Sequence, residues 1–142
     1  MGLSHCCREE VIAVTPDTPV IDVAKTMEQK NVGSVMVVEG DRAVGIITDR
    51  DLVVRIFAQG KSHEGLSARD VMTKDLVTLK DSTGIYEAIE QITDLGIRRM
   101  PLVDDTGRLV GIITLDDIIR LIGKEMSNIA KNLEKQSPPM PR

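Results

Sequence analysis

The chain has 142 residues, of which 42% are apolar and 28% are charged, and its formal net charge at pH 7 is −4. These values are typical of an ordinary globular protein, and the acidic balance argues against a general nucleic-acid binder, which needs a basic face. The sequence contains no apolar run near the roughly 18 residues of a membrane-spanning helix and no secretion-signal pattern. We therefore expect a cytoplasmic protein without a membrane partner.

The first part of the chain predicts the element order β-α-β-β-α. Strands are expected over residues 11–15, 34–39 and 43–48, and a second helix over residues 50–58. Thr18 before Pro19 is typical of a helix start, with threonine as the N-cap and proline at the first helical position. This first helix should end at Asn31, and Gly40-Asp41 between two β-branched runs predicts a hairpin.

The second part predicts the same order after a linker that is rich in glycine and serine. Strands are expected over residues 76–79, 100–103 and 109–114, with a helix over residues 85–95 and a longer one over residues 116–134. The longer helix carries one apolar stripe, made of Ile118, Ile119, Ile122, Met126, Ile129 and Leu133. A stripe that continues beyond the domain needs a partner surface, either on the same chain or on another copy.

The two parts are copies of one unit. The sequence GIITDRD at residues 45–51 returns as GIITLDD at residues 111–117, which is 66 positions later (111 minus 45). Two copies are too few for a solenoid, and a half of about 60 residues would bury only about 60% of its unfolded surface. We therefore expect the copies to pack on each other. The predicted divisions are a first repeat with its lead-in, a linker, a second repeat, and a helix extension with a loose tail, at residues 1–62, 63–70, 71–123 and 124–142.

Each copy ends a strand with a threonine three positions before an aspartate: Thr48 with Asp51, and Thr114 with Asp117. One interpretation is structural, because threonine can cap the helix and the aspartate complements the positive helix end. The other is functional: the glycine of each motif allows a ligand to approach, the helix N-terminus favours an anion, and the carboxylate accepts hydrogen bonds from a cis-diol such as ribose. Both interpretations can hold together.

Arg98 and Arg99 stand together at the start of an otherwise apolar strand. They can be two solvated charges, but arginine also suits phosphate. The first copy has Gly33 and Ser34 at these positions. Any two clefts formed by the copies would therefore differ.

The doubled β-α-β-β-α unit, GIIT-x-x-D at each strand-to-helix turn and GIRRMP at residues 96–101 resemble a tandem pair of cystathionine β-synthase (CBS) domains, the Bateman module. The resemblance covers about residues 3–123. It implies an α+β fold in which two pseudo-symmetric repeats pack sheet to sheet, here with an extended C-terminal helix. It also implies two clefts for adenosine compounds such as AMP, ADP, ATP or S-adenosylmethionine, with no cofactor required.

The resemblance implies roles for individual residues. Asp51 and Asp117 would hold the ribose diol, with Thr48 and Thr114 close to the ribose or phosphate, and the two arginines would hold phosphates. Each cleft would take its base pocket largely from the opposite copy. Ile12, Val32 and Gly33 would lie beside Asp117, and Val77, Ile97 and Arg98 would lie beside Asp51. Ile46 and Ile112 would form apolar walls.

The first copy departs from the family pattern before its first strand. It has Cys6-Cys7-Arg8 where the second copy has the usual Val71-Met72-Thr73. The adjacent cysteines are too close for ordinary disulfide geometry, and a reduced state fits an intracellular protein. They read as small apolar fillers, whereas a metal or redox site that uses them with His5 would need ligands in a tetrahedral arrangement.

Three functions compete at this point. The first is a regulatory module that senses an adenosine ligand and signals by a shift in packing to a partner protein or second subunit. The second is an enzyme, for which the sequence offers no Walker-type loop and no nucleophile-base pair. The third is a ligand-free scaffold that oligomerises through its last helix. We expect the first, without catalysis, as a stand-alone pair that forms a homodimer and signals through an unidentified effector.

Overall fold

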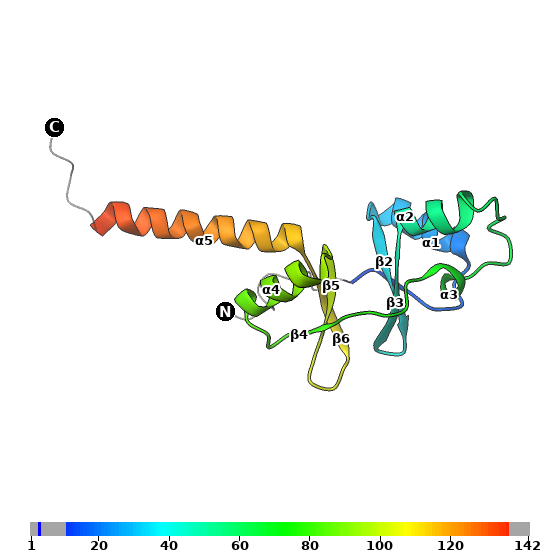
Figure 1. Cartoon of the computed structure of the whole chain (residues 1–142), viewed down its shortest axis with the longest axis horizontal. Helices are drawn as coiled ribbons and strands as arrows, with labels where there is room; N and C mark the ends of the chain where they lie inside the picture. The colour runs from blue at the N-terminus through cyan, green and yellow to red at the C-terminus, as the bar shows by residue number, and fades with distance from the viewer. Residues whose placement is uncertain (1–2, 4–10, 137–142) are drawn as a thin grey trace.

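The computed structural model describes Leu3 and residues 11–136, which form two similar halves, each with one three-stranded sheet (Figure 1). The first half contains β1 (Ala13–Val14), α1 (Val20–Lys30), β2 (Ser34–Glu39), β3 (Arg42–Thr48), α2 (Asp49–Leu52) and the π-helical turn η2 (Val53–Phe57). After the short α3 (Ala68–Val71), the second half contains β4 (Leu79–Lys80), α4 (Ile85–Leu95), β5 (Arg99–Val103), β6 (Leu109–Thr114) and α5 (Leu115–Gln136). The predicted α+β class and doubled β-α-β-β-α order are confirmed.

Both sheets have the same topology. The first strand of each half runs parallel to the second, and the second pairs antiparallel with the third. Ser34 lies opposite Thr48 in the first hairpin, and Arg99 lies opposite Thr114 in the second. Because side chains alternate along a strand and cross-strand partners share a face, these pairs mark equivalent faces of the two sheets.

The other face of each sheet carries the core of its half. The strands of the first half bury Val35, Val37 and Ile47 there, and those of the second bury Met100, Leu102 and Ile113. The helices add the apolar residues that their spacing predicts, which are Val20, Val23 and Met27 from α1 and Ala88 and Ile92 from α4. Aliphatic side chains and methionine therefore build both cores, as expected for a chain with one Tyr, one Phe and no Trp.

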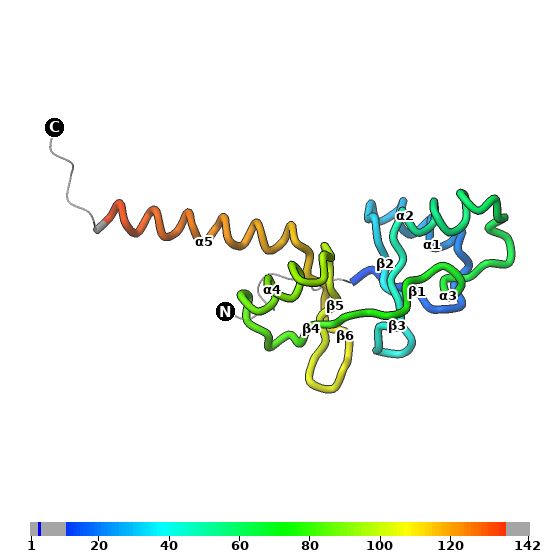
Figure 2. The backbone as a smooth tube through the Cα atoms, viewed as in Figure 1, coloured from blue at the N-terminus to red at the C-terminus, as the bar shows by residue number. Residues whose placement is uncertain are grey.

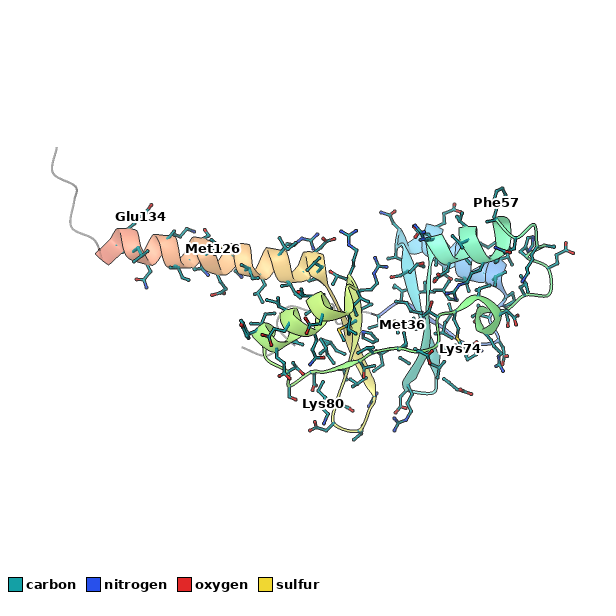
Figure 3. The ribbon with its side chains drawn as sticks, viewed as in Figure 1. Met36, Phe57, Lys74, Lys80, Met126 and Glu134 are labelled. Atoms are coloured by element: carbon teal, nitrogen blue, oxygen red, sulfur yellow. The ribbon has the colours of Figure 1, made fainter. Side chains whose placement is uncertain are left out.

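The faces marked by Ser34 and Arg99 look toward the other half. Met36 is 1% exposed and belongs to neither core, and Figure 3 shows it between the two sheets. Pro101, its counterpart on β5, is also buried and also belongs to neither core. These two residues lie where the halves meet, so the expected sheet-to-sheet packing is present.

The halves also exchange their lead-in segments. Leu3, at the start of the first repeat, is buried in the core of the second half. Ala68 and Val71 of α3, at the start of the second repeat, are buried in the core of the first half. Beyond α3 the chain follows the edge of β3, where Ile46 and Thr73 form an antiparallel bridge, before it reaches β4 (Figure 2). Each core therefore needs residues from both repeats, which the predicted division by sequence did not foresee.

Several predicted boundaries were wrong. The strands expected over residues 11–15 and 76–79 are short, because only Ala13–Val14 and Leu79–Lys80 pair as strands. Thr18 does not cap α1: its hydroxyl accepts from the backbone N–H of Thr15 at 3.0 Å, so it closes a turn, and Pro19 occupies the cap position. The helix expected over residues 50–58 is an α-helical turn that continues as η2.

The last helix extends well beyond the second half (Figure 1). Ile118 of the predicted stripe is 2% exposed and belongs to the second core. The other five stripe residues are 40% to 65% exposed, and they are Ile119, Ile122, Met126, Ile129 and Leu133. The described part of the chain therefore leaves these five residues uncovered.

Candidate functional site

Two cavities lie between the halves, and each is lined by residues from both. The first cavity has a volume of about 250 Å³ and the second about 430 Å³. Ligand pockets in proteins usually measure about 300–1,000 Å³, so the second falls within this range and the first just below it. The cavities are where a ligand could touch both repeats at once.

The first cavity combines residues just before β1 and around the start of β2 with residues of β5, β6 and the start of α5 from the other half. Of the residues predicted for a cleft, it brings together Ile12, Val32, Gly33, Ile112 and Thr114. The second cavity reverses the arrangement, with β3 from the first half. It brings together the predicted residues Ile46, Thr48, Val77, Ile97 and Arg98. The predicted pairing of each strand start with the opposite repeat agrees with this geometry.

Arg99 lines both cavities. Arg98, its neighbour, is exposed and lines only the second. The backbone carbonyl of Arg98 accepts from the N–H of Leu115 at 2.7 Å, and the carbonyl of Gly33 accepts from the N–H of Asp49 at 2.9 Å. These bonds hold the start of β5 and of β2 against the N-terminus of the following helix, where backbone N–H groups favour an anion.

Both T-x-x-D motifs form capping boxes, so the structural interpretation of these residues holds. In the first, the Thr48 N–H donates to Oδ2 of Asp51 at 2.9 Å, and the Asp51 N–H donates to Oγ1 of Thr48 at 3.1 Å. In the second, the corresponding bonds between Thr114 and Asp117 measure 3.3 and 3.1 Å. Each motif thereby satisfies N–H groups that a helix start leaves unpaired.

The second oxygen of each carboxylate faces an arginine. Oδ1 of Asp51 lies 3.8 Å from Nε of Arg55, and Oδ1 of Asp117 lies 3.5 Å from Arg120. Arg55 continues to the lead-in of the second repeat, where it donates to the carbonyl of Val71 at 2.7 Å and to Oγ1 of Thr73 at 3.1 Å. Asp51 is thus connected to the wall of the second cavity through Arg55.

Asp51 and Asp117 are not among the described residues that line either cavity. Their neighbours Asp49 and Asp116 line the second and the first cavity instead. These two acids were not predicted, because the repeated motif marks only positions that the copies share, whereas Asp49 and Asp116 stand at different places in the two copies. Alignment of the copies on their threonines would have shown two extra carboxylates beside the motif.

The functional interpretation of the motif expected Gly45 to leave room for a ligand, but Gly45 packs closely against another part of the chain. A Cβ atom at this position would lie 2.5 Å from the sulfur of Met72. The glycine therefore lets the lead-in of the second repeat pack against β3. The close approach that Gly45 allows is made by Met72 of the same chain and not by a ligand.

Among the described residues, no group of three or more histidines, cysteines or acids could hold a metal ion. His5, Cys6 and Cys7, for which a metal or redox role was the alternative to apolar fillers, lie outside the described residues. In the described part of the chain, no helix is both long and apolar enough to span a membrane.

Comparison with known proteins agrees with this architecture. The model of the CBS domain matches residues 3–58 and again residues 68–124. An uncharacterized protein of Methanopyrus kandleri is 36% identical over 136 residues, which cover 95% of this chain and 69% of that protein. Inosine-5′-monophosphate dehydrogenase of Thermoplasma acidophilum is 42% identical over 111 residues, but these cover 78% of this chain and only 21% of the enzyme.

A solved structure matches the fold closely. The crystal structure of the CBS domain pair of protein MJ0100, in complex with 5′-methylthioadenosine and S-adenosyl-L-methionine, has a TM-score of 0.76 and 25% identity. The match covers 88% of this chain and 98% of that one. Together with the two family matches, one to each half, these findings show that the chain belongs to the CBS domain family and carries a pair of CBS domains.

Proposed function

We propose that this chain is a regulatory module that binds adenosine compounds in its two cavities and signals by a shift in the packing of its halves. The observation that carries the proposal is the pair of equivalent cavities between the repeats, each with apolar walls, a threonine at a helix start and an arginine. A ligand that touches both halves binds one arrangement of them better than another. It therefore shifts the population toward that arrangement.

The chemistry of the cavities supports an adenosine ligand. Ile46, Leu76, Val77 and Ile97 offer the second cavity an apolar surface for a base, while arginine suits the phosphates of AMP, ADP or ATP. The related CBS pair of MJ0100 holds 5′-methylthioadenosine and S-adenosyl-L-methionine, which share the adenosine part without a phosphate. We infer that the base and ribose are the common element, with phosphate as a variable one.

Asp51 and Asp117 are our candidates for the ribose. Each uses Oδ2 for its capping bond, and each keeps on Oδ1 a long contact with an arginine, at 3.8 and 3.5 Å. A carboxylate oxygen can accept more than one hydrogen bond, so a ribose diol could take the place of that contact. Asp49 and Asp116, which line the cavities, are the rival acids.

Isothermal titration calorimetry with adenosine, AMP, ATP, 5′-methylthioadenosine and S-adenosylmethionine tests the proposal. We expect binding of at least one of these compounds, with guanosine as the matched control because it differs only in the base. Recovery of the ligand unchanged after incubation, measured by chromatography, tests the expectation that no catalysis occurs. Absence of binding at millimolar concentrations of every compound would contradict the proposal.

The exposed stripe of α5 supports a second element of the function, self-association as a homodimer. Beyond the second half its residues recur at spacings of three and four, from Ile119 to Leu133, which is the pattern of a helix that packs along another helix. Signal transfer to an effector protein would then use another surface. If neither cavity bound a ligand, this stripe would favour the alternative function, an oligomerisation scaffold.

Sedimentation velocity tests whether the stripe is the contact surface of a dimer. Ile129→Lys places a charge in the stripe and should shift a dimer toward monomer, because a charge inside an apolar helix seam is costly. Asn128→Lys adds the same charge at the adjacent exposed position and should leave the sedimentation coefficient unchanged. Equal behaviour of the two variants would exclude the stripe as the contact surface.

A further inference from the structure

Arg99 breaks the pseudo-symmetry of the two cavities. Ser34, its counterpart in the first repeat at an offset of 65 (99 minus 34), lines only the first cavity. Arg99 lines the second cavity, as its place at the start of β5 requires, and also reaches the first. One long side chain therefore stands at the boundary of two sites, where the first repeat has a short one.

The strand geometry explains which arginine can do this. Arg99 pairs with Thr114 across the hairpin, so its side chain leaves the face of the sheet that looks toward the other half. Arg98 immediately precedes β5, outside the paired strand. It lines the second cavity and not the first, and it provides a natural control for Arg99.

Arg99 as a residue is half-buried. Among the residues that the structure describes, none forms an ion pair or a side-chain hydrogen bond with it. Burial of a charge without a partner is unfavourable. An anionic ligand group beside Arg99 would provide the missing partner.

The other charges that line each cavity balance. In the second cavity, Arg50 and Arg98 are matched in number by Asp49 and Asp75. In the first cavity, Arg120 is matched by Asp116. Among the residues that the structure describes, Arg99 is thus the one positive charge left over in each cavity, and it is the same charge.

From this we infer that Arg99 is shared, so that an anionic group bound in one cavity weakens the binding of a second anionic group in the other. The inference rests on the proposed function and adds the regulation of its two sites. A phosphate carries a charge of about −1.5 to −2 at pH 7 and would hold the guanidinium on its own side. Adenosine has no phosphate to hold the guanidinium on one side, so it should bind to the two cavities independently.

The test needs proteins with one open cavity. Ile12 and Val77 occupy equivalent positions, 65 residues apart (77 minus 12), and line the first and the second cavity respectively. Ile12→Trp and Val77→Trp should each fill one cavity and leave the other open. Calorimetry of AMP and of adenosine on the wild type and on both variants then gives each site alone and both together.

We expect adenosine to bind the wild type with the two affinities seen in the single-cavity variants. In the wild type, the second AMP molecule should bind at least about tenfold more weakly than AMP binds to the same cavity in the variant where the other cavity is filled. A tenfold effect is within the usual range of coupling between sites. Arg99→Ala should weaken AMP in both single-cavity variants and remove the coupling. Arg98→Ala should weaken AMP only where the second cavity is open, and thermal unfolding by circular dichroism checks that all variants fold.

The outcomes separate this inference from the function on which it rests. Absence of binding of adenosine, AMP and the other adenosine compounds alike would overturn both. If adenosine binds and the two AMP affinities of the wild type equal those of the single-cavity variants, Arg99 is not shared. The proposed function then remains intact. Loss of AMP affinity in only one single-cavity variant of Arg99→Ala would likewise overturn the shared arginine. If Ile12→Trp or Val77→Trp unfolds, the two stepwise dissociation constants of AMP are compared in the wild type and in Arg99→Ala. A shared arginine requires the ratio of the weaker to the tighter constant to be smaller in Arg99→Ala than in the wild type.

Discussion

The two cavities are built from the same positions of a duplicated unit, yet they differ in size and in the polar residues that line them. Val11 and Ile12 line the first where Leu76 and Val77 line the second. The apolar walls are thus equivalent, whereas the polar positions are not: Asp116 corresponds to Arg50, and Ser34 to Arg99. Duplication preserved the packing that both halves need and left the charged positions free to change, because packing constrains only the apolar walls.

The difference in volume has a similar origin. Met36 lines the first cavity at the position where the compact Pro101 lines the second, and a long flexible methionine fills irregular space well. The first cavity measures about 250 Å³ and the second about 430 Å³. The smaller cavity therefore depends on one side chain that also holds the halves together.

Met36→Ala should have the largest effect. Loss of a buried methionine side chain typically lowers the free energy of unfolding by about 2–5 kcal/mol, and Met36 is 1% exposed. Urea unfolding followed by circular dichroism measures the change. Tyr86→Ala is the control, because Tyr86 is 74% exposed on α4, outside the α5 stripe and the cavities, and its loss should change the free energy by no more than about 0.5 kcal/mol. Equal effects of the two substitutions would show that Met36 is not a contact between the halves.

Asp51→Ala and Asp117→Ala come next. A hydrogen bond to a charged group is worth about 1.5–3 kcal/mol, so each should weaken adenosine by about 10- to 100-fold in one cavity. Each also removes one member of a capping box and should lower stability by about 1 kcal/mol. Calorimetry at a temperature well below unfolding separates the two effects.

Asp49→Ala and Asp116→Ala test the same question from the other side, because these acids line the cavities. If they weaken adenosine and the motif aspartates do not, the assignment taken from the family resemblance is wrong for this chain. The comparison of cavities would then rest on acids that stand at different positions in the two repeats.

Much of this site could be predicted from the sequence, because a fixed offset of 65 or 66 residues places equivalent positions in two copies. The repeat alone pairs Ile12 with Val77 and Thr48 with Thr114, and these residues do line the two cavities. The helix over residues 85–95 and the strand over residues 109–114 also have the expected bounds. Local pattern and repetition were sufficient where the contacts are local or repeated.

Contacts that cross between the copies could not be predicted in the same way. The burial of Leu3 in the second core and of Ala68 in the first depends on how the chain returns across the molecule, and local patterns carry no signal for that path. The reach of Arg99 into both cavities depends on the distance between the sheets. The position of Asp51 behind the cavity wall depends on its capping bond with Thr48, which competes with an orientation toward a ligand.

Ser34→Arg would repair the asymmetry. A second guanidinium at the equivalent position of the first repeat should let each cavity keep its own arginine. The ratio of the two stepwise dissociation constants of AMP should therefore fall by up to about tenfold. Ser127→Arg on α5 is the control, because it adds the same charge at an exposed position outside the cavities. If Ser127→Arg changed the AMP steps as much as Ser34→Arg, the general charge of the protein would explain the coupling.

Asp70→Asn should have the smallest effect and should concern mainly the wall of the second cavity. Asp70 accepts from the backbone N–H of Ser67 at 2.8 Å and from its hydroxyl at 3.2 Å, and it thereby caps α3, which leads to Thr73 and Asp75 in that wall. The backbone hydrogen bond from Ser67 is the main cause that lowers the pKa of Asp70 below the ordinary value of 3.8.

The sign of the pH dependence follows from this direction. Because the folded pKa is lower than the unfolded one, the ionised carboxylate stabilises the fold at pH values above about 3.8, and this contribution is lost as the pH falls through the folded pKa. Asp70→Asn should therefore lower the Tm on the order of 2 °C at pH 7, and the difference from wild type should vanish in strong acid. Asp105→Asn, at an exposed turn position, is the matched control in the same thermal unfolding series. A difference that persisted unchanged into strong acid would mean that the carboxylate charge of Asp70 does not hold α3.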